Sequence, residues 1–155
     1  MRKLFALICF LIGSSTYAQE IHVTDVINRI ELGELVGNRD LSFGVKNVLE
    51  ELVQDYGYDL NPKSENLLTV ELLYFDVMKS SLQLGAYGKN IDVYQVIARG
   101  TLVLDGKSRT ELAKGTAKSI STATLIIDEG GKFSQANVST AIKKLCDDLL
   151  KKLKL

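Results

Sequence analysis

The clearest pattern along the chain is an apolar stripe between Asp40 and Gly57. Apolar residues in this stretch recur at intervals typical of an amphipathic α-helix, with polar residues between them. Asp40 or Ser42 can cap its N-terminus, and Gly57 stands where a left-handed residue commonly ends a helix. We therefore predict a helix over 40–57 whose apolar face needs a partner surface. The stripe comprises Val45, Val48, Leu49, Leu52, Val53 and Tyr56.

A strand-rich region is predicted after a polar turn at 61–64. Residues 68–74 alternate with a period of two, and one of their two faces is much more apolar than the other. The alternation resumes at 82–84, just before a glycine-rich break at 85–90. This pattern predicts a first strand that ends near Asp76 and a second segment that leads into the break.

Two further strands are predicted around a tight turn. Residues 91–104 are rich in β-branched and aromatic side chains, which favours a strand. Asp105 and Gly106 suit a type I′ hairpin turn, in which both central residues have positive φ, so residues 109–127 should form an antiparallel strand. One face of that strand carries small side chains only, so something must lie close to it. A helix is the simplest occupant, and a ligand or a partner strand is the alternative. The small residues are Ala113, Gly115, Ala117 and Ser119.

The two ends of the exported chain complete the element order. Residues 135–152 repeat the helical pattern, and lysines in the last turn suit the negative end of the helix dipole. Residues 20–36 are predicted to contain an N-terminal strand, interrupted near Gly33. The inward face of the second helix comprises Val138, Ala141, Ile142, Leu145, Leu149 and Leu153.

This order of elements predicts a two-layer α+β sandwich. Two helices with one apolar stripe each are best buried together on one face of an antiparallel meander sheet. The other face of the sheet then keeps apolar residues that the helices cannot cover, and such exposed surfaces usually mark a partner site. We expect this uncovered face to include Leu67, Leu73, Phe75, Val93, Ile97 and Val103.

The N-terminal residues 1–18 have the features of a secretory signal. Arg2 and Lys3 precede a short apolar run, and Thr16 to Ala18 supply a small-residue cleavage site, so we predict cleavage before Gln19. An uncleaved membrane anchor is the first alternative, but the run is far shorter than the roughly 20 residues of a spanning helix. A lipoprotein signal is the second alternative. Cys9 lies inside the apolar run, which fits that pattern poorly. Residues 19–155 are expected to form one exported domain.

Charge and cysteine content narrow the function classes. The full chain carries 19 basic and 19 acidic residues, and loss of Arg2 and Lys3 leaves a net charge of −2. No broad basic field suggests nucleic acid as a partner. Cys146 is the one cysteine left after cleavage, so no intramolecular disulfide is expected. We interpret it as a thiol packed at the edge of the apolar helix face, with pairing to another chain as the alternative.

The element order resembles that of the small envelope accessory proteins of the YajG and LptE type. An export signal precedes a strand, a helix that ends in the turn of Val48 to Tyr58, an antiparallel meander and a C-terminal helix. It is similar, more distantly, to the domain of the curli secretion lipoprotein CsgG. The resemblance implies a periplasmic protein, associated with the outer membrane, that binds or supports a larger partner without catalysis. The chain lacks their lipid-attachment cysteine, which favours membrane contact only through a partner. No functional residue is carried over.

No catalytic constellation is predicted. His22 is the one histidine, and it lies near the expected new N-terminus, which is a poor place to orient an imidazole. One histidine and one remaining cysteine cannot supply the three or four ligands that zinc needs. Asp76, Asp128 and Glu129 are interpreted as a strand end and a solvated loop, not as a catalytic carboxylate pair.

Cofactor binding is not expected either. Gly130, Gly131 and Lys132 lack the other glycines and the Ser or Thr of a phosphate-binding loop, so we interpret them as a connection before the second helix. Neither a metal nor a cofactor is expected.

We therefore predict a non-enzymatic periplasmic adaptor of an outer-membrane assembly or transport complex. It would dock through the uncovered sheet face or an exposed edge strand, with Leu73, Phe75, Tyr87 and Ile97 as candidate partner-binding residues. Tyr87, in a glycine-bounded loop, is the aromatic residue most expected to reach a partner. A homo-oligomer built by edge pairing is compatible with this interpretation.

Two other functions remain open. A carrier of a small apolar ligand would hold it between the helices and the sheet, beside Ala113, Gly115 and Ala117, and would need a cavity there. An enzyme of an unrecognised type is the least favoured.

Overall fold

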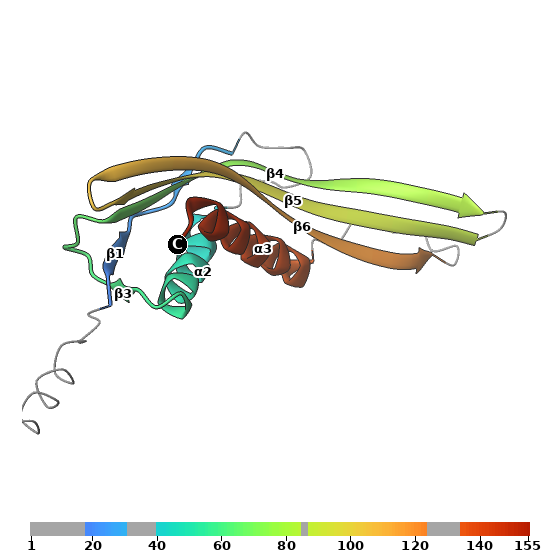
Figure 1. Cartoon of the computed structure of the whole chain (residues 1–155). Coiled ribbons are helices and arrows are strands. Elements are labelled where there is room, and N and C mark those ends of the chain that lie inside the picture. The colour runs from blue at the N-terminus through green and yellow to red at the C-terminus, as the bar shows by residue number, and fades with distance from the viewer. Residues whose placement is uncertain (1–17, 31–39, 85–86, 124–133) are drawn as a thin grey trace, which may run out of the picture.

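The chain folds into two layers, one of strands and one of helices. The computed structural model describes residues 18–30, 40–84, 87–123 and 134–155. Helices α2 (Ser42–Asp55) and α3 (Gln135–Leu153) lie on the same side of a mixed sheet (Figure 1). The predicted two-layer α+β architecture with both helices on one face is confirmed. The strand order is β3-β1-β4-β5-β6, with β2 also paired to β4; their bounds are β1 Glu20–Val23, β2 Ile27–Asn28, β3 Asp59–Leu60, β4 Leu67–Leu84, β5 Tyr87–Leu104 and β6 Lys107–Ala123.

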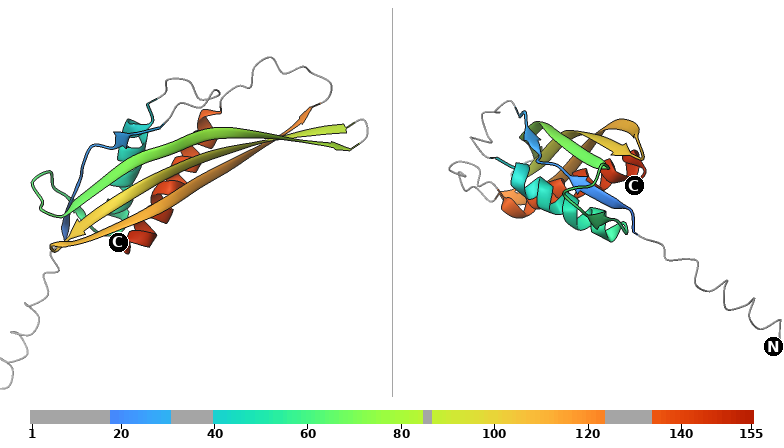
Figure 2. Two further views of the ribbon diagram at one scale, coloured as in Figure 1. Left: turned by 90° about the horizontal axis from the view of Figure 1, so that it is seen from above. Right: turned by 90° about the vertical axis from the view of Figure 1, so that its left-hand side faces the viewer.

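Strands β4, β5 and β6 form the predicted antiparallel meander. Asp105 and Gly106 join β5 to β6 with φ values of 50° and 72°, so both have the positive φ that the type I′ turn requires. β4 is one continuous strand, and the prediction that it ends near Asp76 is wrong because its ladder to β5 continues to Leu84. At this end the three strands extend past the helices, as Figures 1 and 2 show.

The N-terminal strands pair in a way that the sequence did not predict. β1 runs parallel to both β3 and β4, and β2 runs parallel to β4. The chain leaves β1 and β2, passes through α2 on one face, and returns to the sheet in β3 and then in β4. A crossover helix of this kind places the strands that it connects parallel. The sheet is therefore mixed, with its antiparallel part confined to the meander.

Helix α2 ends as predicted but begins differently. Gly57 has φ of 88° and donates to the Gln54 carbonyl at 2.9 Å, while the Tyr58 N–H reaches the Val53 carbonyl at 3.2 Å. These two hydrogen bonds form a Schellman motif. At the N-terminus, Leu41 is the capping residue, so neither Asp40 nor Ser42 is the N-cap. The Asp40 carboxylate instead accepts from the Ser42 N–H at 2.9 Å.

Helix α3 occupies the small-residue face of β6. A Cβ built on Gly115 would lie 1.9 Å from the Ala141 carbonyl oxygen and 2.8 Å from Leu145 Cβ. The helix backbone therefore touches the sheet, which confirms that a helix covers the small residues. Arg109 Nη1 donates to the Leu153 carbonyl at 2.6 Å and so satisfies one of the last carbonyls of α3.

The core lies between the two layers and consists of apolar side chains from both helices and from the sheet. Burial alone holds it, since the described part of the chain has one free cysteine, Cys146, and no disulfide. Fully buried side chains include Ile21, Leu49, Val53, Leu72, Phe75, Tyr94, Leu145 and Leu149.

Several predictions fall outside the described residues. They are the signal segment 1–17, the end of the N-terminal segment at 31–39, the end of the third strand, and the loop containing Asp128, Glu129 and Gly130 to Lys132. Within the described ranges, neither helix combines the length and apolar character needed to cross a membrane.

Candidate interaction surface

A β-bulge in β4 decides which side chains reach the open face of the sheet. The register between β4 and β5 shifts between Leu72 and Tyr74, so Leu73 is an extra residue without its own partner. Because one inserted residue reverses the alternation, Leu72 and Phe75 both point into the core. The expectation that Phe75 lies on the uncovered face is therefore wrong. Tyr74 takes its place, and its side chain is 36% exposed.

The open face, opposite the helices, carries several exposed apolar side chains. Leu112 is 54% exposed and Met78 is 44% exposed, while Ile97 is half-buried between Tyr74 and Lys114 in the ladder. The candidate residues Leu73 and Ile97 lie in this region. We use the name open face for the outward residues of β2, β4, β5 and β6 together with Arg29, which directly follows β2. Its partly or largely exposed apolar members among the described side chains are Ile27, Leu67, Leu73, Tyr74, Met78, Ile91, Val93, Ile97, Val103 and Leu112.

Tyr87 lies away from this group. It is the first residue of β5 and pairs with Leu84, which places it at the tip of the β4–β5 hairpin. Its side chain is outside the described part of the structure, so its role as a contact residue stays a prediction.

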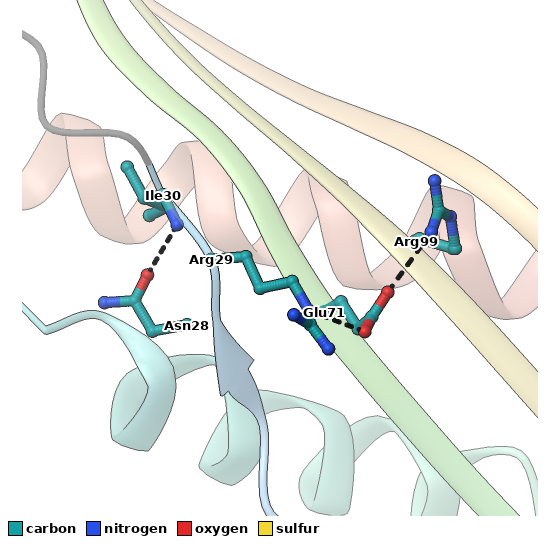
Figure 3. Close-up of polar contacts among 5 residues, drawn as sticks. All are labelled: Asn28, Arg29, Ile30, Glu71 and Arg99. Carbon is teal, nitrogen blue, oxygen red and sulfur yellow. Dashed lines mark hydrogen bonds and ion pairs between the residues drawn. The ribbon is translucent and has the colours of Figure 1, made fainter.

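Three charged side chains form an ion-pair network across the open face. The Glu71 carboxylate on β4 accepts from Arg29 Nε at 2.8 Å and from Arg99 Nη1 on β5 at 3.3 Å (Figure 3). Arg29 directly follows β2. Its backbone N–H donates to the Leu72 carbonyl at 2.9 Å, which extends the pairing of this segment with β4. The network thus links three neighbouring strands, and it places two guanidinium groups on either side of one carboxylate.

The open face is basic, although the exported chain is predicted to be slightly acidic. Among the side chains that the structure describes on this face, the basic ones are Arg29, Arg99, Lys114 and Lys118, and the acidic ones are Glu71 and Asp76. These described side chains therefore have an excess of two positive charges beside the apolar residues. Sequence reasoning missed the charged members, although a signal was present. Arg99 lies two residues from Ile97, and Glu71 two residues from Leu73, so strand alternation alone places them on the same face.

Both edges of the long meander are partly occupied by side chains. On β6, the Lys114 N–H donates to Asp148 Oδ2 at 3.3 Å, and the Leu112 carbonyl accepts from Lys152 Nζ at 2.9 Å. On β4, the Val77 N–H donates to the adjacent Asp76 carboxylate at 2.7 Å. Edge strands whose backbone groups are already engaged are poor templates for pairing.

Asp76 also organises Tyr74. The Tyr74 hydroxyl donates to Asp76 Oδ2 at 3.2 Å. Partial burial, and then the nearby Asp76 charge, raise the pKa of Tyr74 above its usual value, so the hydroxyl keeps its proton and acts as a donor. Asp76 thus fixes a side chain of the open face and engages the β4 edge.

The remaining candidate chemistry does not assemble into a site. His22 lies within β1, half-buried, and not on a free terminus. Cys146 is buried between the helices with Sγ 4.0 Å from the Val45 carbonyl, and burial raises the pKa of its thiol to about 12. The interpretation of a packed helix thiol is confirmed. Among the described residues, no group of three potential ligands lies close enough to hold a metal ion.

One exposed aromatic residue lies on the helical layer and was also missed. Phe43 on α2 is 75% exposed, and it falls two residues before Val45, outside the apolar stripe. This position outside the stripe was the sequence signal that Phe43 does not point into the core. Phe43 lines a hollow together with Val26 and Lys46. A separate groove between the N-terminal halves of α2 and α3 is lined by Leu41, Gly44, Val48 and Val138.

Comparisons with known proteins give a fold and no family. No protein-family model and no curated protein sequence matches the chain. The fold is similar to that of a neuraminyllactose-binding hemagglutinin homolog from Helicobacter pylori, with a TM-score of 0.50 and 8% identity over 88% of this chain and 83% of that chain.

Weaker structural similarity extends to two other bacterial proteins. One is a PelC dodecamer from Paraburkholderia phytofirmans (TM-score 0.47, 12% identity, 90% of this chain and 94% of that chain). The other is rare lipoprotein B from Shewanella oneidensis (0.43, 13%, 86% and 93%). At these identities the likeness concerns the fold alone, and the assignment to the YajG and LptE type stays a prediction.

Proposed function

We propose that the chain is a non-enzymatic accessory protein of the cell envelope that binds a larger protein of an outer-membrane assembly or transport complex. The observation that carries this proposal is the one-sided placement of the helices. Because α2 and α3 cover a single face of the sheet, the opposite face keeps Tyr74, Met78 and Leu112 exposed to solvent. A surface of this kind, with charged groups around it, is typical of a protein–protein contact.

The face is a better docking site than the edges. Asp76, Asp148 and Lys152 already engage backbone groups of β4 and β6 at the edges. A partner strand would have to displace these side chains before it could pair there. Docking over the open face requires no such displacement.

Export is part of the proposal and rests on the N-terminal sequence. Gln19 is held by the fold, since its side chain donates to Asp105 Oδ1 at 2.9 Å and its carbonyl accepts from the Asp59 N–H at 3.1 Å. Cleavage before Gln19 would leave both contacts intact. Mass measurement of the protein recovered from the periplasmic fraction tests the cleavage, and retention of residues 1–18 would contradict it.

The docking surface is tested by two substitutions on the open face. Leu73→Asp and Ile97→Asp each place a charge among apolar side chains, and we expect them to abolish co-purification of the partner after crosslinking in cells. Lys143→Asp, on the exposed face of α3, is the matched control and should leave the partner bound. Thermal unfolding of each variant checks that the domain is folded. Unchanged recovery with both open-face variants would refute this docking surface.

The alternative of an apolar-ligand carrier is less favoured. Its binding space was expected beside Gly115, where the α3 backbone instead touches the sheet. Native mass spectrometry of the mildly extracted protein separates the two functions, because a carrier would retain lipid and an adaptor would appear as the bare chain.

A further inference from the structure

The ion-pair network on the open face leaves positive charge and hydrogen-bond donors uncommitted. Two guanidinium groups share the single carboxylate of Glu71, so the network has a net charge of +1. Each guanidinium carries five N–H donors. Among the described residues, the Arg29 side chain uses only Nε and the Arg99 side chain only Nη1. Both side chains remain accessible, at 61% and 49% exposure.

Glu71 holds these two groups in place. Its own side chain is only 20% exposed, and it contacts one guanidinium through each carboxylate oxygen. As Figure 3 shows, Arg29 and Arg99 approach it from opposite sides, from the segment that follows β2 and from β5. An arginine that is already oriented loses less side-chain entropy when it binds a second anion. The two arginines of the network are therefore already oriented to bind a second anion.

We propose that Arg29 and Arg99 form a carboxylate-binding subsite at the centre of the docking surface, which receives an Asp or Glu side chain of the protein partner. This inference rests on the proposed function and names the chemistry of the partner. The exposed apolar neighbours Ile27 and Leu112 flank the network, because both lie level with Glu71 or Arg99 in the ladder. The matching partner segment therefore combines an acidic side chain with apolar residues beside it.

A protein carboxylate fits this subsite better than an anionic membrane. The planar guanidinium fork matches a carboxylate geometrically, and such paired hydrogen bonds are among the strongest in proteins. Membrane-binding surfaces usually gather about four to eight basic residues. Four of the described side chains on the open face are basic, but Glu71 and Asp76 offset two of them. The remaining excess of two positive charges is a small field for a bilayer and is sufficient for one acidic side chain.

Peptide binding provides the direct test. The probes are two labelled peptides, one of alternating Glu and Val residues and one of alternating Gln and Val, whose binding to the purified protein is followed by fluorescence anisotropy. We expect the Glu peptide to bind at least about tenfold more tightly than the Gln peptide. The double variant R29Q/R99Q should remove this preference, and R29K/R99K, which keeps the charge but not the fork, should lose most of it.

The control variant changes the same number of charges elsewhere on the open face. Lys114 and Lys118 are exposed and do not contact Glu71, so K114Q/K118Q should weaken binding of the Glu peptide less than about threefold. Equal binding of the two peptides, or no binding of the Glu peptide, would overturn the subsite. Equal losses of Glu-peptide binding in R29Q/R99Q and K114Q/K118Q would also overturn it. So would binding to vesicles of equimolar phosphatidylcholine and phosphatidylglycerol that is tighter than binding to the Glu peptide and depends on the two arginines.

The subsite and the docking surface fail in distinguishable ways. If Ile97→Asp abolishes co-purification of the partner but R29Q/R99Q does not, the docking surface stands and the carboxylate subsite is wrong. If neither variant reduces co-purification, the docking surface itself is wrong.

Discussion

The backbone of Ala141 in α3 lies directly against Gly115 in β6. A methyl group at Gly115 would approach the Ala141 carbonyl oxygen to 1.9 Å, which no real structure tolerates. The neighbouring small residues Ala113 and Ala117 are buried on either side of this contact. The distance between helix and sheet is therefore set by the absence of a side chain at one position, and the helical layer is held tightly to a single face.

Gly115→Ala should be strongly destabilising. Because the neighbouring atoms are backbone and cannot rotate away, α3 must shift, and we expect a loss of about 3 kcal/mol in the free energy of unfolding. Urea denaturation measures it. The matched control is Gly44→Ala in α2, where nothing lies within 4 Å of the new methyl group. That change should stabilise the protein by up to about 1 kcal/mol. Similar free energies for the two variants would contradict the close packing of α3.

Cys146 should make stability fall at high pH. Burial raises the pKa of the folded thiol to about 12, while the unfolded thiol titrates near 9. The unfolded chain therefore loses its proton first, so the contribution of the thiol is complete below pH 9 and is lost as pH rises towards 12. Cys146→Ala should show a shallower decline over this window in urea titrations. The native thiol should also resist iodoacetamide at pH 8 until the protein is unfolded, and rapid native alkylation would refute its burial.

Asp76→Ala should promote self-association. It frees the Val77 N–H on the edge of β4 and releases the Tyr74 hydroxyl, so the edge becomes available for pairing with another chain. We expect a concentration-dependent increase in sedimentation coefficient with little change in unfolding temperature. Asp92→Ala removes the same charge from β5, which has a strand on each side, and should remain like the unaltered protein. Equal behaviour of the two variants would show that Asp76 does not protect the edge.

Ser134→Ala should cost about 1 kcal/mol of stability. Ser134 is the N-cap of α3, and its hydroxyl accepts from the Asn137 N–H at 3.4 Å. Its own N–H donates to the Tyr94 hydroxyl at 3.0 Å, a backbone contact that the substitution keeps. Ser139→Ala, on the exposed side of the same helix, should change the free energy of unfolding by less than about 0.5 kcal/mol. Urea denaturation of both variants measures the difference.

Most of the fold could be predicted because its signals are local. The stripe from Val45 to Tyr56, the Asp105–Gly106 turn and the small residues around Gly115 each report on their own segment of the chain. The parallel pairing of β1 with β4 could not be predicted, because it joins residues more than 40 positions apart and β1 has only four residues. Such short strands carry too few alternations to define a partner or a direction.

The candidate site was only partly predictable, for a related reason. Alternation along each strand placed Ile97 correctly, and it also contained the information that Arg99 shares its face. The meeting of Arg29 with Glu71 depends on the register of β2 against β4, which no local pattern encodes. The prediction placed Phe75 on the wrong face of the sheet because no pattern in the residues around Leu73 indicates the bulge.

The bulge at Leu73 shows that the number of residues in β4 decides which of its side chains lie on the open face. Deleting Leu73 would keep Leu72 paired with Ala98 and Tyr74 with Ile97, so Phe75 would stay in the core and the open face would lose one apolar side chain. One further residue in β4 that no second bulge accommodated would instead reverse the alternation beyond it, and would turn Tyr74, Asp76 and Met78 towards α3 and Phe75 and Val77 towards solvent. The same composition would then offer a partner a different set of side chains over the far half of β4. Such an insertion would change which residues a partner meets, whereas a substitution would only alter one of them.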